Sequence, residues 1–118
     1  MKNNTNVLVY HNPRCSKSRC ALDFLKEKEV DFEVVEYIKQ VPTIEELTAI
    51  VTLLGIEPFA LVRTGEAVYK EQFKGKQLSD GQWIEAMVAF PQLIERPIVI
   101  KNGKGVIARP VERIVEIL

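Results

Sequence analysis

The sequence has few cysteines, a single histidine and no excess of charge of either sign. Its two cysteines, Cys15 and Cys20, are too few for the disulfide framework of a small secreted domain. Sixteen Lys and Arg residues balance sixteen Asp and Glu residues, so no overall field attracts nucleic acid or an anionic membrane. Any anion-binding site must therefore be built locally.

Long apolar runs and ligand-binding motifs are also missing. The first ten residues hold only a four-residue apolar run, at 7–10, which is far short of a signal peptide or a membrane span. We therefore expect a cytoplasmic protein with no membrane or nucleic-acid partner. A glycine-rich phosphate loop is absent. His11, Cys15 and Cys20 have the wrong spacing for zinc, so we expect no metal and no bound cofactor.

The N-terminal third carries a strand, helix, strand pattern. Residues 7–10 form an apolar run that stops at a polar, proline-containing turn, and residues 32–37 predict a second strand. Apolar residues at helical spacing predict an amphipathic helix over about residues 16–28. Two strands joined by a helix most naturally lie parallel.

The middle of the chain predicts helices only. Thr43 with Glu46, and Ser79 with Gln82, are capping boxes that begin two helices, and Gly55 ends the first of them. Shorter helical turns are predicted over residues 58–62 and 66–73. We interpret about residues 43–90 as a helical insertion within a single domain that spans residues 1–118.

The C-terminal part predicts a hairpin followed by a helix. Residues 98–100 and 106–108 flank Asn102 and Gly103, two residue types that tolerate the positive φ angles of a tight turn. Pro110 at a first helical position begins a final amphipathic helix. Its apolar positions at α-helical spacing are Val111, Ile114, Val115 and Leu118.

Cys15 is the strongest chemical signal, because it lies where the first strand meets the first helix. Free backbone N–H groups and the helix dipole favour negative charge at this place, and Arg14, Lys17 and Arg19 add positive charge nearby. Such surroundings lower the pKa of a cysteine and can also hold an oxyanion. The alternative, a buried apolar cysteine, fits poorly with the polar turn around it.

Three further arginines, Arg63, Arg96 and Arg109, stand at the boundaries of predicted elements. The Arg96-Pro97 bond precedes the third strand, at the edge of the sheet where the Cys15 turn should also lie. Guanidinium groups present forked donors that match tetrahedral oxyanions. Each arginine taken alone is better explained as a solvated surface charge or as a partner of a helix end, and only the three together indicate an anion site.

Four separated motifs together resemble the glutaredoxin-dependent arsenate reductases, a thioredoxin-fold family. Residues 11–19 match the family's H-x₃-C-x₃-R motif, and the resemblance extends over essentially the whole chain. The three arginine-bearing segments that match are Leu61-Val62-Arg63, Glu95-Arg96-Pro97-Ile98-Val99 and Ala108-Arg109-Pro110. The resemblance implies a thioredoxin-like α/β fold in the order β-α-β, helical insertion, β-β-α, with a four-stranded mixed sheet flanked by helices.

The resemblance also implies a covalent reaction. Cys15 would attack arsenate to give an adduct, glutathione as co-substrate would displace oxygen at arsenic, and glutaredoxin would complete the reduction to arsenite. The residues that would hold the adduct are Arg63, Arg96 and Arg109. By the same resemblance His11 and Arg19 keep Cys15 ionised, and Pro97 is a cis-proline. A structural hydrogen bond in the turn explains His11 equally well. We expect a monomer.

Other functions stay open at this point. A general thiol–disulfide oxidoreductase would need a second cysteine where Ser18 stands, and so would most redox-sensing regulators that dock on RNA polymerase. A phosphatase-type arsenate reductase would need arginine in place of Ala21.

We expect Cys20 to be a core or half-buried residue, because about 140° of helix separates it from Cys15, with a resolving role as the alternative. The physiological oxyanion and the electron donor are not determined by the sequence.

Overall fold

A computed structural model describes residues 7–118. Contacts between Cα atoms divide the chain into two compact units, one made of residues up to 40 together with 96–118 and the other of residues 41–95. The segment expected as a helical insertion, about residues 43–90, falls inside the second unit. Within residues 7–118 no helix has both the length and the apolar character needed to cross a membrane.

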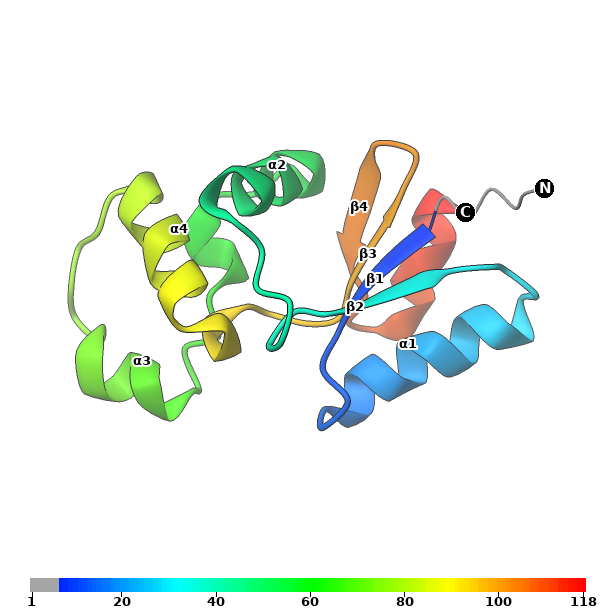
Figure 1. Ribbon diagram of the computed structural model, residues 1–118, viewed down its shortest axis with the longest axis horizontal. Coiled ribbons are helices and arrows are strands. Elements are labelled where there is room, and N and C mark those ends of the chain that lie inside the picture. The colour runs from blue at the N-terminus through cyan, green and yellow to red at the C-terminus, as the bar shows by residue number, and fades with distance from the viewer. Residues whose placement is uncertain (1–6) are drawn as a thin grey trace. The chain divides into compact units, whose positions relative to one another are not determined.

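The first unit is built on a mixed sheet (Figure 1). In the described residues the sheet has four strands in the order β2-β1-β3-β4. β1 is parallel to β2 and antiparallel to β3, and β3 is antiparallel to β4. The strands are β1 (Val7–His11), β2 (Glu33–Glu36), β3 (Ile98–Lys101) and β4 (Lys104–Ile107). This topology confirms the predicted thioredoxin-like arrangement, including the parallel first pair.

Two helices pack against one face of this sheet. α1 (Ser16–Glu27) joins β1 to β2, and η3 (Val111–Ile117) follows β4. Both contribute to a single apolar cluster with alternate residues of the strands, because successive strand side chains point to opposite faces. The buried members are Val7, Val9, Ala21, Leu25, Val99, Val106, Ala108, Ile114 and Ile117. The helices therefore flank the sheet as predicted.

The last helix differs from the prediction. η3 is a 3₁₀-helix, and Pro110 is its N-cap rather than its first helical residue. A 3₁₀-helix has three residues per turn, so residues three apart lie on the same side. Ile114 and Ile117 are accordingly buried, whereas Val115 is 56% exposed. The α-helical spacing that placed Val115 and Leu118 on the apolar side was the wrong period for this segment.

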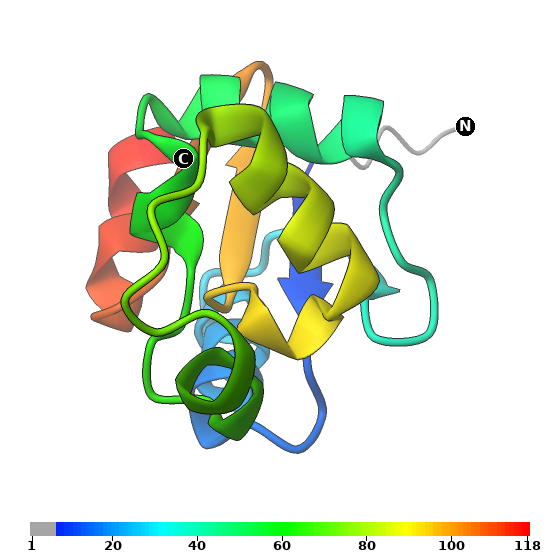
Figure 2. The same ribbon diagram turned by 90° about the vertical axis from the view of Figure 1, so that its left-hand side faces the viewer.

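The second unit consists of short helices (Figure 2). They are α2 (Ile44–Leu54), η1 (Pro58–Leu61), α3 (Ala67–Gln72), α4 (Asp80–Ala89) and η2 (Pro91–Leu93). Both predicted capping boxes are present, at Thr43 and at Ser79, and Gly55 ends α2 with a φ of 68°. α4 packs on α2 and η1, and its buried Trp83 lies against Phe59, with ring centroids 4.9 Å apart. η2 was not predicted.

Candidate active site

The sheet gathers the candidate residues of the first unit at one edge. Tyr10, near the end of β1, pairs with Ile98 at the start of β3, and Ile98 also pairs with Ile107 at the end of β4. The turn that leads to Cys15, the segment before β3 and the segment after β4 therefore leave the sheet on the same side. These segments carry Cys15, Arg96 and Arg109, so the predicted location of Arg96 beside the Cys15 turn is confirmed.

The turn between β1 and α1 is tied to the first turn of the helix. The Cys15 backbone N–H donates to the Asn12 carbonyl at 2.9 Å, and the Asn12 backbone N–H donates to Ser18 Oγ at 3.3 Å. Arg19 Nη1 donates to the Pro13 carbonyl at 2.8 Å. These hydrogen bonds connect residues that are close in sequence, so they hold the backbone of the turn that carries Cys15 locally.

Cys15 is the N-cap residue of α1 and is half-buried. Burial raises its pKa, but hydrogen bonds from the Ser18 backbone N–H, the Arg96 side chain and the Lys17 backbone N–H, together with the Arg96 charge, lower it from 9.0 to about 7. The two N–H groups are among the unpaired donors at a helix start. The lowered pKa favours the thiolate of Cys15 near neutral pH, and the thiolate is the nucleophile.

The groups that lower this pKa differ in part from those expected. The sequence predicts that helix-start N–H groups and the nearby charges of Arg14, Lys17 and Arg19 lower the pKa. The N–H groups of Lys17 and Ser18 do so, but the positive charge that acts comes from Arg96. From the sequence, Ser18 is notable only as the position where a second cysteine is missing. Its side chain is fully buried at the start of α1, and its backbone and hydroxyl both serve the Cys15 turn.

His11 ends β1 and is 6% exposed. Burial lowers its pKa below 6.5, while the Glu36 carboxylate opposes that shift. Glu36 is the residue opposite His11 in the β1–β2 pair. His11 is therefore neutral at neutral pH. The roles of His11 and Arg19 in keeping Cys15 ionised stay predictions.

Arg63 belongs to the second unit, where two carboxylates hold it. Its backbone N–H donates to the Leu93 carbonyl at 2.7 Å, and the Glu95 N–H donates to the Leu61 carbonyl at 2.8 Å, which sets Arg63 beside Glu95. Arg63 Nη1 lies 3.2 Å from Glu95 Oε1, and Nε lies 3.5 Å from Glu66 Oε2. The sequence alone predicts no role for either carboxylate. Joint binding of one oxyanion by Arg63, Arg96 and Arg109 stays a prediction.

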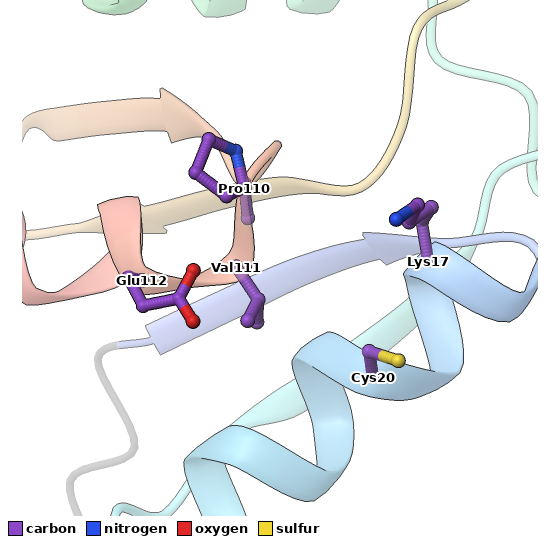
Figure 3. Close-up of a pocket in the computed structure, with 6 residues that line it drawn as sticks. Lys17, Cys20, Pro110, Val111 and Glu112 are labelled. Atoms are coloured by element: carbon purple, nitrogen blue, oxygen red, sulfur yellow. The ribbon is translucent and has the colours of Figure 1, made fainter.

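Cys20 is exposed, which contradicts the expectation of a core or half-buried residue. The helix buries Ser18, Ala21 and Leu25 against the sheet, and Cys20 falls outside that stripe. It lines a hollow of about 210 Å³ between α1 and the start of η3 (Figure 3). The other residues around the hollow are Lys17, Ala108, Pro110, Val111 and Glu112.

Two peptide bonds beside the site are cis. The bond between Arg96 and Pro97 is one of them, as the family resemblance implied, and the bond between Arg109 and Pro110 is the other. Within residues 7–118 no cluster of three or more His, Cys, Asp and Glu side chains is placed to hold a metal ion.

The fold and the site define a thioredoxin-fold protein with a cysteine of lowered pKa at the start of its first helix. The chain belongs to the ArsC family, whose model matches residues 10–117. This match includes Cys15 and all three candidate arginines.

Relatives of known sequence or structure agree with this membership. The chain is 45% identical to the uncharacterized protein YfgD of Escherichia coli K12, over 95% of this chain and 96% of that protein. It is 39% identical to a protein named arsenate reductase from Neisseria meningitidis, over 95% and 97%. A solved structure named arsenate reductase from Vibrio cholerae superposes with a TM-score of 0.93 at 43% identity, covering 98% of this chain and 100% of that one.

Proposed function

We propose that this protein is an arsenate reductase that uses Cys15 as its nucleophile. The observation that carries the proposal is the Arg96 side chain on the sulfur of Cys15, which combines a nucleophile with a group that binds oxyanions. The names of the Neisseria and Vibrio relatives support arsenate as the substrate. A thiolate and a guanidinium side by side can bind arsenate and attack it in the same place.

The first step makes a bond to arsenic without changing its oxidation state. The Cys15 thiolate attacks arsenic, an S–As bond forms, and an As–O bond breaks as its oxygen leaves as water after taking up protons. Arg96 binds the remaining oxygens, and Arg63 and Arg109 are proposed to do the same. Fixed positive charge stabilises the negative charge that builds on these oxygens during the attack.

Reduction needs two electrons, and we propose glutathione and glutaredoxin as their source. The glutathione thiol displaces a second oxygen from arsenic, again as water. A glutaredoxin thiolate then attacks the glutathione sulfur, a disulfide forms between them, and the electron pair of the broken S–As bond reduces arsenic from the pentavalent to the trivalent state. Water finally cleaves the bond between Cys15 and arsenic, which releases arsenite and the Cys15 thiol.

The position of Ser18 argues against a general thiol–disulfide oxidoreductase. Such an enzyme needs a second thiol three residues after the first. Ser18 occupies that position and is fully buried. Phosphate has the same shape and charge as arsenate, but only arsenic accepts electrons from thiols, so reduction is specific to arsenate even where binding is not.

A coupled assay tests the proposal. Arsenate turnover is measured with glutathione, glutaredoxin and a glutathione-recycling system for the wild type and for Cys15→Ser, with each donor omitted in turn. Turnover by the wild type that Cys15→Ser abolishes is the expected result, because serine does not ionise at this pH. Equal rates for the two proteins would overturn the proposal. Turnover that persists without glutaredoxin would replace the proposed donor.

A further inference from the structure

The hollow between α1 and the start of η3 lies within the first unit and is lined by opposite charges (Figure 3). Lys17 and Glu112 are both exposed, and in Figure 3 the ends of their side chains point toward the space between the two helices. Among residues 7–118 neither forms an ion pair, so each charge is open to a ligand. Ala108, Pro110 and Val111 add an apolar surface beside the two charges.

An α-amino-acid group matches this pair of charges. It carries an ammonium and a carboxylate on one carbon, so Glu112 can bind the ammonium and Lys17 the carboxylate. The volume of about 210 Å³ is below the roughly 300–1,000 Å³ of pockets that enclose a whole drug-sized ligand, so the hollow fits one end of a small molecule. An inorganic oxyanion would be attracted by Lys17 but repelled by Glu112.

The stability of α1 does not account for Lys17. This residue lies in the first turn of α1, where the helix dipole disfavours positive charge, and α1 has no acidic residue in that turn. Glu112 lies in the first turn of η3, where negative charge is favourable. Ligand binding in the hollow therefore gives the lysine a role that helix stability does not.

Lys17 also connects the hollow to the Cys15 site. Its backbone N–H donates to the sulfur of Cys15, and the same residue lines the hollow. The two places are therefore separated by about the length of one lysine residue. Arg109 stands in the chain between two other residues of the hollow, Ala108 and Pro110. Three residues of extended chain cover about 10 Å, which is enough for a tripeptide to occupy the hollow and reach Cys15.

We propose that the hollow is a subsite for the glutamyl end of glutathione, the thiol donor of the proposed reaction. Glutathione has a free α-amino-acid group because its glutamate is joined through the side-chain carboxyl. Lys17 binds the carboxylate of this group, Glu112 binds its ammonium, and the thiol extends toward the arsenic on Cys15. Both contacts are exposed to water, so each is weak and together they orient the donor. This inference rests on the proposed function in that it takes glutathione as the donor.

The binding test uses S-methylglutathione, which cannot reduce arsenic or form a disulfide. Because Cys20 lines the hollow, bound ligand should slow its alkylation by iodoacetamide, followed by mass spectrometry of the peptide that carries Cys20. The ligand is titrated with the wild type, Lys17→Gln and Glu112→Gln. Each substitution should raise the Kd about threefold, the scale of one exposed ion pair. Lys26→Gln and Glu27→Gln, at exposed positions in the last turn of α1, are the matched controls.

Two further ligands identify what the hollow recognises. An analogue of S-methylglutathione that lacks the α-ammonium has no partner for Glu112, so Glu112→Gln should leave its Kd unchanged while Lys17→Gln raises it. Free glutamate has the same amino-acid group without the rest of the peptide and should bind more weakly. Glutamate that binds as tightly as S-methylglutathione would make the hollow an amino-acid site and would overturn its role as a donor subsite.

The remaining outcomes also decide the proposal. No protection of Cys20 in the wild type, an unchanged Kd in both Lys17→Gln and Glu112→Gln, or an equal change in the two controls would overturn it. Circular dichroism shows that the variants fold. The KM for glutathione is measured separately in the coupled assay and should rise in both variants. Binding without arsenate turnover overturns only the proposed reductase activity, and turnover with an unchanged KM for glutathione in both variants overturns only the subsite.

Discussion

The Arg96 side chain donates a hydrogen bond to the sulfur of Cys15, although the two residues lie near opposite ends of the chain. The register of the sheet explains this, because Tyr10 at the end of β1 pairs with Ile98 at the start of β3. Arg96 lies two residues before Ile98. The positive charge that acts on Cys15 is therefore delivered by strand pairing, and not by the basic residues that neighbour Cys15 in sequence.

Arg96→Gln should raise the pKa of Cys15. The wild-type rate of alkylation by iodoacetamide should increase with pH around a midpoint of about 7, because the thiolate is the reactive form. Glutamine removes the Arg96 charge, so the midpoint should move toward 9, and Arg96→Lys should fall between the two. Arg14→Gln removes the arginine that directly precedes Cys15 and serves as the matched control. Equal midpoints for Arg96→Gln and the wild type would contradict the assignment.

Mass spectrometry should follow the two cysteines separately in this measurement. Cys20 is exposed and also reacts with iodoacetamide, so only the peptide that carries Cys15 reports the midpoint. The Cys20→Ser protein gives the same information with a single thiol.

Those parts of the fold could be predicted whose signal lies within a few neighbouring residues of the sequence. The capping boxes at Thr43 and Ser79, and the Asn102-Gly103 turn, are each determined by hydrogen bonds or φ angles within a few residues. The final helix could not be predicted in the same way. An α-helix and a 3₁₀-helix differ by only 0.6 residue per turn, and over seven residues the packing of Ile114 and Ile117 decides between them.

Ser18→Ala should destabilise the protein while leaving the pKa of Cys15 near 7. Alanine removes the hydroxyl that accepts the Asn12 N–H but keeps the backbone N–H that lowers the Cys15 pKa. We expect the free energy of unfolding in urea to fall by about 1 kcal/mol, the typical worth of one hydrogen bond. Ser16→Ala gains the same helix propensity at an exposed position, so the difference between the two variants isolates the hydrogen bond.

The candidate site could be predicted only as far as single residues. The position of Cys15 at a strand–helix junction follows from the sequence, because polar turn residues and an amphipathic helix surround it. The Glu95 carboxylate on Arg63 could not be found this way. Glu95 reaches Arg63 only because residues 61–63 and 93–95 pair, and that pairing depends on how the second unit folds, whereas Glu66 is a local partner three residues from Arg63.

His11 should titrate below its ordinary value. It is the single histidine of the chain, so one imidazole signal in an NMR pH titration reports it. Burial lowers its pKa below 6.5 and Glu36 opposes the shift, so Glu36→Gln should lower the pKa further. A midpoint at or above 6.5 for the wild type would contradict this.

The same shift makes stability depend on pH in a defined direction. Below about pH 6.5 the unfolded chain binds a proton at His11 that the folded protein does not yet bind. The His11 contribution to stability is therefore lost as the pH falls from about 6.5 to the lower folded pKa, and it is constant above that window. Urea unfolding at several pH values should show a smaller dependence in His11→Gln over this range and a larger one in Glu36→Gln.

Cys20→Ser should leave arsenate turnover unchanged. α1 is a continuous helix from Ser16 to Glu27 with Cys15 as its N-cap, so Cys20 lies on a different side of the helix from Cys15. A disulfide between them would require the Cα atoms within about 7 Å and the side chains directed at each other, and so would require the first turn of α1 to unwind. That unwinding would also break the N–H contacts of Lys17 and Ser18 that keep Cys15 ionised. In the coupled assay, kcat for Cys20→Ser below one-tenth of the wild-type value, with the helical circular dichroism signal intact, would make Cys20 a resolving thiol and would show that α1 opens during the reaction.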